Sequence, residues 1–184
     1  MRRIFIAIRI EPGETFSRMY SSLRSLLGNE KINWVNPEGI HLTLVFLGDT
    51  EEERIKVAGI VLKQKCTGFG EFSFTLEGTG VFGNFNNPRV IWTGIRNTEK
   101  LVELNKLIVE GLKDTGFKIE ERQFRPHITL GRIKSIQNSA ALQSAIGRYK
   151  NTLIQEVQVK EVILFESILK PTGPVYRPAG KFQI

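Results

Sequence analysis

Both histidines of this 184-residue chain stand in the same kind of four-residue phrase, HLTL from His41 and HITL from His127. A pair of imidazoles is suited to moving protons at neutral pH, because histidine titrates near that pH. One neutral ring can take a proton from an attacking water while a second, protonated ring gives one to a leaving oxygen. Thr43 and Thr129 follow their histidines by two residues, and their hydroxyls can donate to the non-bridging oxygens of a phosphate. The pattern therefore indicates acid–base chemistry at phosphorus, with the attacking and leaving oxygens in line between the histidines.

One charged side chain is well placed to assist this chemistry. Arg125 stands two positions before His127, and a guanidinium can stabilise the charge of a pentacovalent phosphate. The alternative is that Arg125, with Arg122 and Arg132 nearby, belongs to a solvated basic face. A single histidine in a strand is also more often structural than catalytic, and a following threonine fits ordinary strand preference. The repetition of the phrase reverses that expectation.

Other chemistries have little support in the sequence. There is no HxH or HExxH pattern, and the only aspartates are Asp49 and Asp114, so we expect no metal. No Walker loop and no GxSxG elbow occurs, and no GxGxxG loop opens a helix, so we expect no cofactor. The glycines at 78, 80 and 83 are too loosely spaced for such a loop, and we interpret them as turn glycines.

Composition suggests the surroundings and the partner. The net charge of +7 favours a polyanionic partner. No run of Lys and Arg is dense enough for a disordered nucleic-acid tail, so the fold must assemble any basic patch. We expect no membrane segment, because the apolar start of the chain is short and is broken by Arg9. Cys66 is alone, which favours a reducing cytoplasm and a buried, unreactive thiol.

The hydrophobic pattern alternates strands and helices. The predicted strands are 3–10, 39–47, 72–77, 80–82, 89–95, 125–133, 153–159, 162–169 and 175–182. The predicted helices are 14–27, 51–65, 98–116 and 139–149, with Thr50 as the N-cap of the second. Within the two motif strands, alternation should place His41, Thr43, His127 and Thr129 on a polar face above an apolar floor.

The two motifs lie nearly half the chain apart, and similar elements follow each of them. This spacing predicts an internal duplication. We therefore expect one two-lobed domain over residues 1–184, with two pseudo-symmetric halves. The predicted fold class is α+β, with antiparallel sheets lining a central cleft and helices packed outside.

The chain resembles the two-histidine phosphoesterase superfamily, and in particular its RNA 2′,3′-cyclic phosphodiesterases, historically called 2′-5′ RNA ligases. The resemblance covers essentially the whole chain. It includes RRIFIAI, WVNPEGIHLTLVFLGD, PRVIWTGI, FRPHITLGR and SILKPTGPVYRPAGKF. One departure is Gly131, where alanine is more common in the family, and we expect it to affect packing only.

The resemblance implies a bilobal fold with both motifs in a central cleft, and hydrolysis of a 2′,3′-cyclic phosphate at an RNA end to a 2′-phosphomonoester. It implies that His41 donates a proton to the 3′ oxygen, that His127 accepts one from water, and that Thr43 and Thr129 hold the phosphate. From the residues alone, either histidine could be the acid. Run backwards with a 5′-hydroxyl RNA, the same site would make a 2′-5′ bond without ATP.

Two other interpretations compete with this one. The first keeps the chemistry but takes small cyclic nucleotides or nucleotide-sugar cyclic phosphates as substrates. The second is a non-catalytic RNA-binding module. Under the leading interpretation the partner is RNA with a 2′,3′-cyclic phosphate end, tRNA fragments being one candidate, and the protein is a monomer. Five aromatic residues could furnish stacking surface for bases or else belong to the core. They are Trp34, Phe46, Phe82, Phe85 and Trp92.

Overall fold

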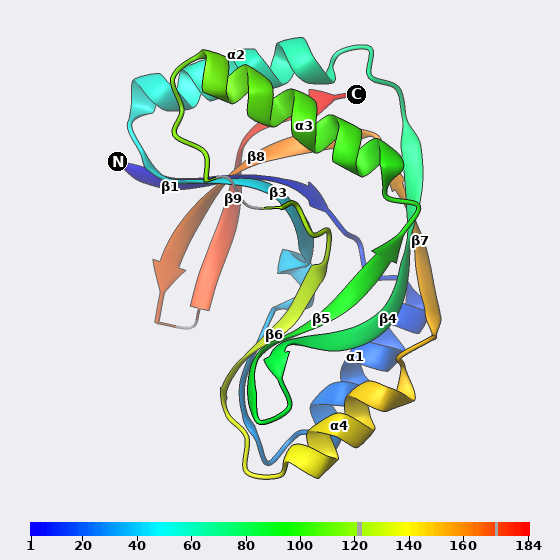
Figure 1. Cartoon of the computed structure of the whole chain (residues 1–184). Coiled ribbons are helices and arrows are strands. Elements are labelled where there is room, and N and C mark those ends of the chain that lie inside the picture. The colour runs from blue at the N-terminus through cyan, green and yellow to red at the C-terminus, as the bar shows by residue number, and fades with distance from the viewer. Residues whose placement is uncertain (121–122, 172) are drawn as a thin grey trace.

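The computed structural model describes residues 1–120, 123–171 and 173–184, and its strands form two antiparallel sheets. The strands are β1 (Arg2–Arg9), β2 (Lys31–Trp34), β3 (His41–Thr50), β4 (Phe72–Asn84), β5 (Asn87–Arg96), β6 (Ile128–Ser135), β7 (Leu153–Val159), β8 (Glu161–Lys170) and β9 (Gly173–Gln183). The first sheet has the order β3-β1-β8-β9, and the second has the order β2-β6-β5-β4-β7. Figure 1 shows the first sheet in the upper lobe and the second curving through the lower lobe.

Helices cover the outer face of each sheet. They are α1 (Glu14–Leu26), α2 (Glu52–Cys66), α3 (Glu99–Asp114) and α4 (Ser139–Arg148). Helices α2 and α3 pack together over the first sheet, and α1 and α4 pack against the second (Figure 1). The predicted α+β class, with two lobes of antiparallel sheet and helices outside, is confirmed.

Each sheet combines strands from both halves of the sequence. In the first, β1 lies between β3 and β8, and in the second, β4 and β5 lie between β6 and β7. A lobe of the fold is therefore not one half of the chain. The exchange of strands ties the lobes together, and buried residues from both sheets form one continuous hydrophobic core.

Several local predictions were wrong. Residues 72–84 form one strand rather than two, because the extra residue Gly78 is accommodated as a bulge opposite β5. Gly78 and Gly83 both have positive φ and both lie within β4, so they are not turn glycines between strands. Gly80 lies in the same strand against the ring of Trp92, and a Cβ atom at this position would come within 2.3 Å of that ring, which is too close.

Two further differences concern element ends. Thr50 ends β3, and its hydroxyl donates to the carbonyl of Gly48 at 3.0 Å, so it does not cap the following helix. Glu51 takes the N-cap position instead, without a side-chain bond. The short edge strand β2 was not predicted, because four residues are too few to show a period.

No helix in the described part of the chain is long and apolar enough to cross a bilayer. Cys66 is fully buried, as predicted, and burial raises the pKa of its thiol to about 11. A thiol with that pKa is almost entirely protonated at neutral pH and is a poor nucleophile.

Candidate active site

The two histidine phrases place their polar residues as the alternation predicts. In the first copy Leu42 and Leu44 are buried, whereas His41 is half-buried and Thr43 is exposed. The second copy repeats this pattern, with Ile128 and Leu130 fully buried and with His127 and Thr129 half-buried. The second motif strand begins three residues later than the predicted 125–133, since β6 starts at Ile128, and His127 immediately precedes it.

Each imidazole is held through Nδ1 by a backbone carbonyl two residues earlier. His41 Nδ1 lies 2.7 Å from the carbonyl oxygen of Gly39, and His127 Nδ1 lies 2.7 Å from that of Arg125. A carbonyl oxygen can only accept, so Nδ1 carries the proton in both rings. Nε2 of each ring is then the atom left to accept or donate a proton at the cleft.

Aromatic side chains surround both imidazoles. Phe5 of β1 and Tyr176 of β9 each lie 4.9 Å from the His41 ring, measured between centroids, and Tyr176 meets it edge-on. Phe82 of β4 lies 4.7 Å from the His127 ring and is perpendicular to it. These contacts restrict the orientation of both rings. Sequence reasoning missed Phe5 and Tyr176, which reach His41 only through the pairing of distant strands.

The two imidazoles share one electrostatic environment. Burial is the main cause that lowers the pKa of His41, and the positive charges of Arg132 and His127 lower it further. The hydrogen bond with the carbonyl of Gly39 opposes this change in the pKa. Strands β3 and β6 contact each other, so the structure brings the two motif strands together. An anionic phosphate between the rings would counteract both positive charges and favour protonation of His41.

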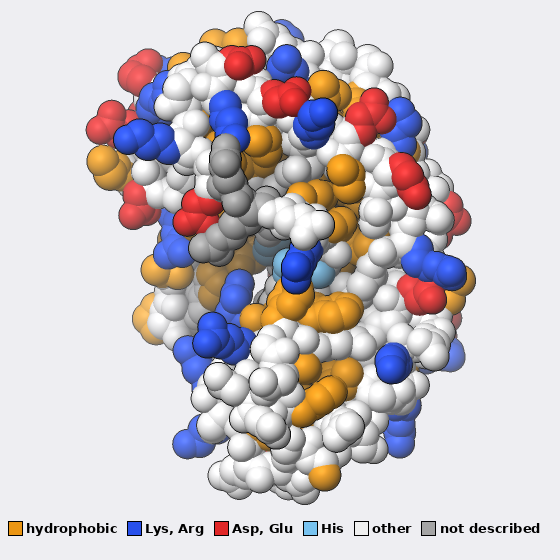
Figure 2. Space-filling view, viewed as in Figure 1, with side chains coloured by type: hydrophobic (Ala, Val, Ile, Leu, Met, Phe, Trp, Pro, Cys, Tyr) orange, Lys and Arg blue, Asp and Glu red, His pale blue; other side chains and the backbone are white. Residues whose placement is uncertain are grey.

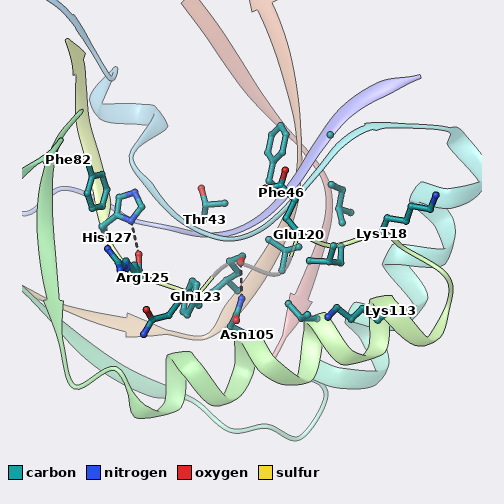
Figure 3. Close-up of a pocket in the computed structure, with 17 residues that line it drawn as sticks. Thr43, Phe46, Phe82, Asn105, Lys113, Lys118, Glu120, Gln123, Arg125 and His127 are labelled. Atoms are coloured by element: carbon teal, nitrogen blue, oxygen red, sulfur yellow. Dashed lines mark hydrogen bonds between the residues drawn. The ribbon is translucent and has the colours of Figure 1, made fainter. Parts of the chain in front are cut away.

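A groove of about 1010 Å³ opens beside the motifs. Figure 2 shows the hollow between the lobes, with histidine visible inside it and basic side chains around it. In the close-up of Figure 3, His127 and Phe82 stand at one end, Thr43 stands in the middle, and Phe46, Lys113 and Lys118 stand at the other end.

The remaining predicted site residues take different positions. Arg125 lines the groove, and its carbonyl holds His127, as the dashed line in Figure 3 marks. His41 does not line this groove but borders a void of only about 10 Å³ enclosed with Phe165 and Tyr176. Thr129 does not line it either; it lies on β6 opposite Trp92 of β5.

The predicted aromatic surface is divided. Phe46 and Phe82 line the groove. Trp92 lies behind Phe82, with centroids 5.5 Å apart, and Trp34 and Phe85 are partly buried against the core. Only the first two are therefore placed to contact a ligand in the groove.

A β-bulge follows the threonine of each motif and changes which residues face the cleft. In β3 the partners of Thr43 and Val45 are consecutive residues of β1, so Leu44 is the extra residue. In β6 the partners of Thr129 and Gly131 are likewise consecutive in β5. The bulge turns the fifth residue after each histidine outward, and these residues are Phe46 and Arg132, both exposed. A strict alternation would have placed them with the core.

Gly131 lies at a close contact between β6 and β2. A Cβ atom at this position would lie 2.8 Å from Cγ2 of Ile32 and 3.1 Å from the Trp34 ring. Glycine therefore allows β2 to approach β6 closely. In the described part of the chain, no group of three or more His, Cys, Asp or Glu residues gathers in a way that could hold a metal ion.

Two antiparallel sheets that carry paired His-x-Thr motifs at the contact between β3 and β6 are typical of a class of phosphoesterase. The model of the LigT like Phosphoesterase family matches residues 7–92 and 95–176, and the chain belongs to this family. A protein of Methanothermobacter thermautotrophicus named RNA 2′,3′-cyclic phosphodiesterase is 32% identical over 184 residues, 99% of this chain and 98% of that protein. A protein of Methanocaldococcus jannaschii with the same name is 35% identical over 175 residues, 95% of this chain and 96% of its own length.

Solved structures share the fold. A crystal structure of a Thermus thermophilus protein superposes with a TM-score of 0.81 at 28% identity, covering 98% of this chain and 97% of that one. Escherichia coli LigT complexed with 3′-AMP superposes with a TM-score of 0.74 at 20% identity, covering 100% of this chain and 98% of its own. The second likeness is one of fold alone.

Proposed function

We propose that this protein is a phosphodiesterase that opens the 2′,3′-cyclic phosphate at an RNA end to a 2′-phosphomonoester, without a metal ion. The observation that carries this proposal is the pair of His-x-Thr motifs on β3 and β6, two strands that contact each other, with Nδ1 of each imidazole bonded to a carbonyl and Nε2 left for substrate. The names of the relatives support the choice of substrate.

In the proposed reaction, Nε2 of His127 accepts a proton from water as the water oxygen attacks phosphorus. The bond from phosphorus to the 3′ oxygen breaks, and Nε2 of His41 gives that oxygen a proton, which leaves a 3′-hydroxyl and a 2′-phosphate. Thr43 and Thr129 donate hydrogen bonds to the non-bridging oxygens, and Arg125 stabilises the charge that develops there. Proton exchange with solvent then restores His41 to its charged form and His127 to its neutral form.

The partner and setting follow from charge and cysteine use. The net charge of +7 suits an RNA substrate, for which tRNA fragments are one candidate. The lone, buried cysteine agrees with a cytoplasmic location. The monomeric state, and ligation as the reverse reaction, stay predictions.

Product analysis tests this proposal. The protein is incubated in EDTA with an RNA oligonucleotide that ends in a 2′,3′-cyclic phosphate, and the ends are identified by chromatography against 2′- and 3′-phosphate standards. We expect conversion to the 2′-phosphate alone. A 3′-phosphate product would contradict the assigned geometry, and a requirement for added metal would contradict the acid–base mechanism.

A further inference from the structure

We propose that the groove beyond Thr43 binds the RNA strand that precedes the cyclic end, with a base stacked on Phe46 and a backbone phosphate near Lys118. This inference rests on the proposed function and extends it from the reacting phosphate to the length of the substrate. It makes the preferred substrate an oligonucleotide rather than a cyclic mononucleotide.

The groove has room for more than the reacting nucleotide. Its volume of about 1010 Å³ reaches the upper end of the ~300–1,000 Å³ range of pockets that enclose one drug-sized molecule. A nucleotide is of that size. The groove also extends from Thr43 along β3 as far as Gly48, and α3 forms part of its wall through Asn105, Val109 and Lys113.

The RNA strand has little space on the side of His41 that faces away from the groove. There Phe5, Phe165 and Tyr176 pack together, with centroids of Phe5 and Tyr176 only 5.1 Å apart. The void that borders Phe165, Tyr176 and His41 measures about 10 Å³, which is too small for a nucleotide. A strand joined to a phosphate held between the two histidines is therefore directed along the groove.

Phe46 is an exposed aromatic residue in a position where a ligand can reach it. Its relative exposure is 52%, although phenylalanine is usually buried. The bulge at Leu44 turns it out of the core, and the same bulge in the other motif turns out Arg132, whose charge acts on His41. The equivalent positions of the two motifs are thus both turned out of the core. One presents a cation near the histidines, and the other presents an aromatic ring at the far end of the groove (Figure 3).

The chemistry around Phe46 suits a single nucleic-acid strand. Base stacking on an aromatic ring does not depend on sequence, and lysines nearby can follow the phosphates. The guanidinium of Arg3 lies over one face of the Phe46 ring, 5.2 Å from its centre, so a base would stack on the other face with a positive charge nearby. Lys113 and Lys118 line the same end of the groove, together with the acidic Glu120. Lys118 is exposed, so its ammonium group can meet solvent or ligand.

The test compares substrates of different length. The value of kcat/KM is measured for a 2′,3′-cyclic mononucleotide and for a tetranucleotide that ends in the same cyclic nucleotide. The variants are Phe46→Ala and Lys118→Ala. Their matched controls are Ile60→Ala, an exposed apolar residue of α2, and Lys150→Ala, an exposed lysine between α4 and β7.

We expect the wild type to prefer the tetranucleotide. Phe46→Ala should lower kcat/KM about tenfold on the tetranucleotide, the equivalent of ~1.4 kcal/mol, and leave the mononucleotide unchanged. For Lys118→Ala, the slope of log(kcat/KM) against log[salt] on the tetranucleotide should become shallower by about 0.7, the contribution of one phosphate contact in a single strand. The control variants should match the wild type on both substrates.

Three outcomes would overturn the inference in distinguishable ways. Equal kcat/KM on the two substrates in the wild type would leave the proposed function standing and remove the strand site. An equal loss on both substrates in Phe46→Ala would assign that residue a structural role instead. Hydrolysis of neither substrate by the wild type would refute the proposed function, and with it the strand site.

Discussion

Replacing His127 by alanine should abolish turnover while leaving the protein folded. The imidazole is the proposed acceptor of the proton from water, and a positioned acid–base group contributes roughly 10²–10⁴-fold to a rate. Phe82 packs edge-on against His127, and the Arg125 carbonyl accepts from it. We therefore expect kcat to fall by at least about 100-fold, with product affinity largely kept because Thr43 and Arg125 remain in the groove.

The stability cost of the same change can be worked from these two contacts. Loss of one hydrogen bond costs about 0.5–1.5 kcal/mol, and loss of one edge-to-face aromatic contact costs a similar amount. A total of about 2 kcal/mol is well below the ~5–15 kcal/mol that holds a domain folded. More than nine-tenths of the variant therefore stays folded at 25 °C, and unfolding cannot account for a 100-fold loss.

The assay is single-turnover hydrolysis of an RNA with a 2′,3′-cyclic end, with a thermal melt of every variant. Phe82→Leu is the matched control, because it removes the same aromatic contact but keeps the imidazole and its bond to the carbonyl. The double variant His41→Ala/His127→Ala should be little less active than the less active of the two single variants, since both rings act in one step. Retention of more than a tenth of the wild-type rate by His127→Ala would refute the assigned role, as would losses that multiply in the double variant.

Three other predictions concern pH and packing. If His41 is the proton donor, kcat/KM falls as the pH rises through the pKa of His41. The positive charge of Arg132 lowers this pKa, so Arg132→Gln should raise it. The alkaline limb of the pH profile should therefore move to higher pH. Hydrogen bonds from Arg2 and Arg177 lower the pKa of Glu166 below its ordinary value of 4.5. These bonds therefore stabilise the fold above pH 4.5, and the stabilisation is lost as the pH falls through the lowered pKa. Melting curves from pH 7 to pH 3 should therefore decline less steeply in Glu166→Gln, from a lower starting temperature, and parallel curves would contradict this. Gly131→Ala brings a Cβ atom to 2.8 Å from Cγ2 of Ile32; calorimetry should show a melting temperature about 2–4 °C lower, the equivalent of ~1 kcal/mol, with hydrolysis unchanged.

Local patterns in the sequence were sufficient for much of the fold and for the centre of the site. Helix α3 follows from the spacing of Leu101, Leu104 and Ile108, which are all fully buried on one face. The polar face of each motif follows from the two-residue period of a strand, and it holds as far as Thr43 and Thr129. In both cases the determining interactions lie within a few residues of one another, so the sequence alone displays them.

Tertiary structure decided what surrounds that centre. Phe46 lines the groove and Arg132 is exposed because each motif strand bulges against its neighbour, and a bulge depends on the hydrogen bonds of the partner strand. Tyr176 meets His41 because β9 joins the first sheet through β8, although more than a hundred residues of chain separate the two rings. The sequence by itself determined the candidate reacting groups and the strand faces on which they lie. Pairing between distant strands decided the register, and the register determined which other side chains line the cleft, because hydrogen bonding across a sheet leaves no local period in the sequence.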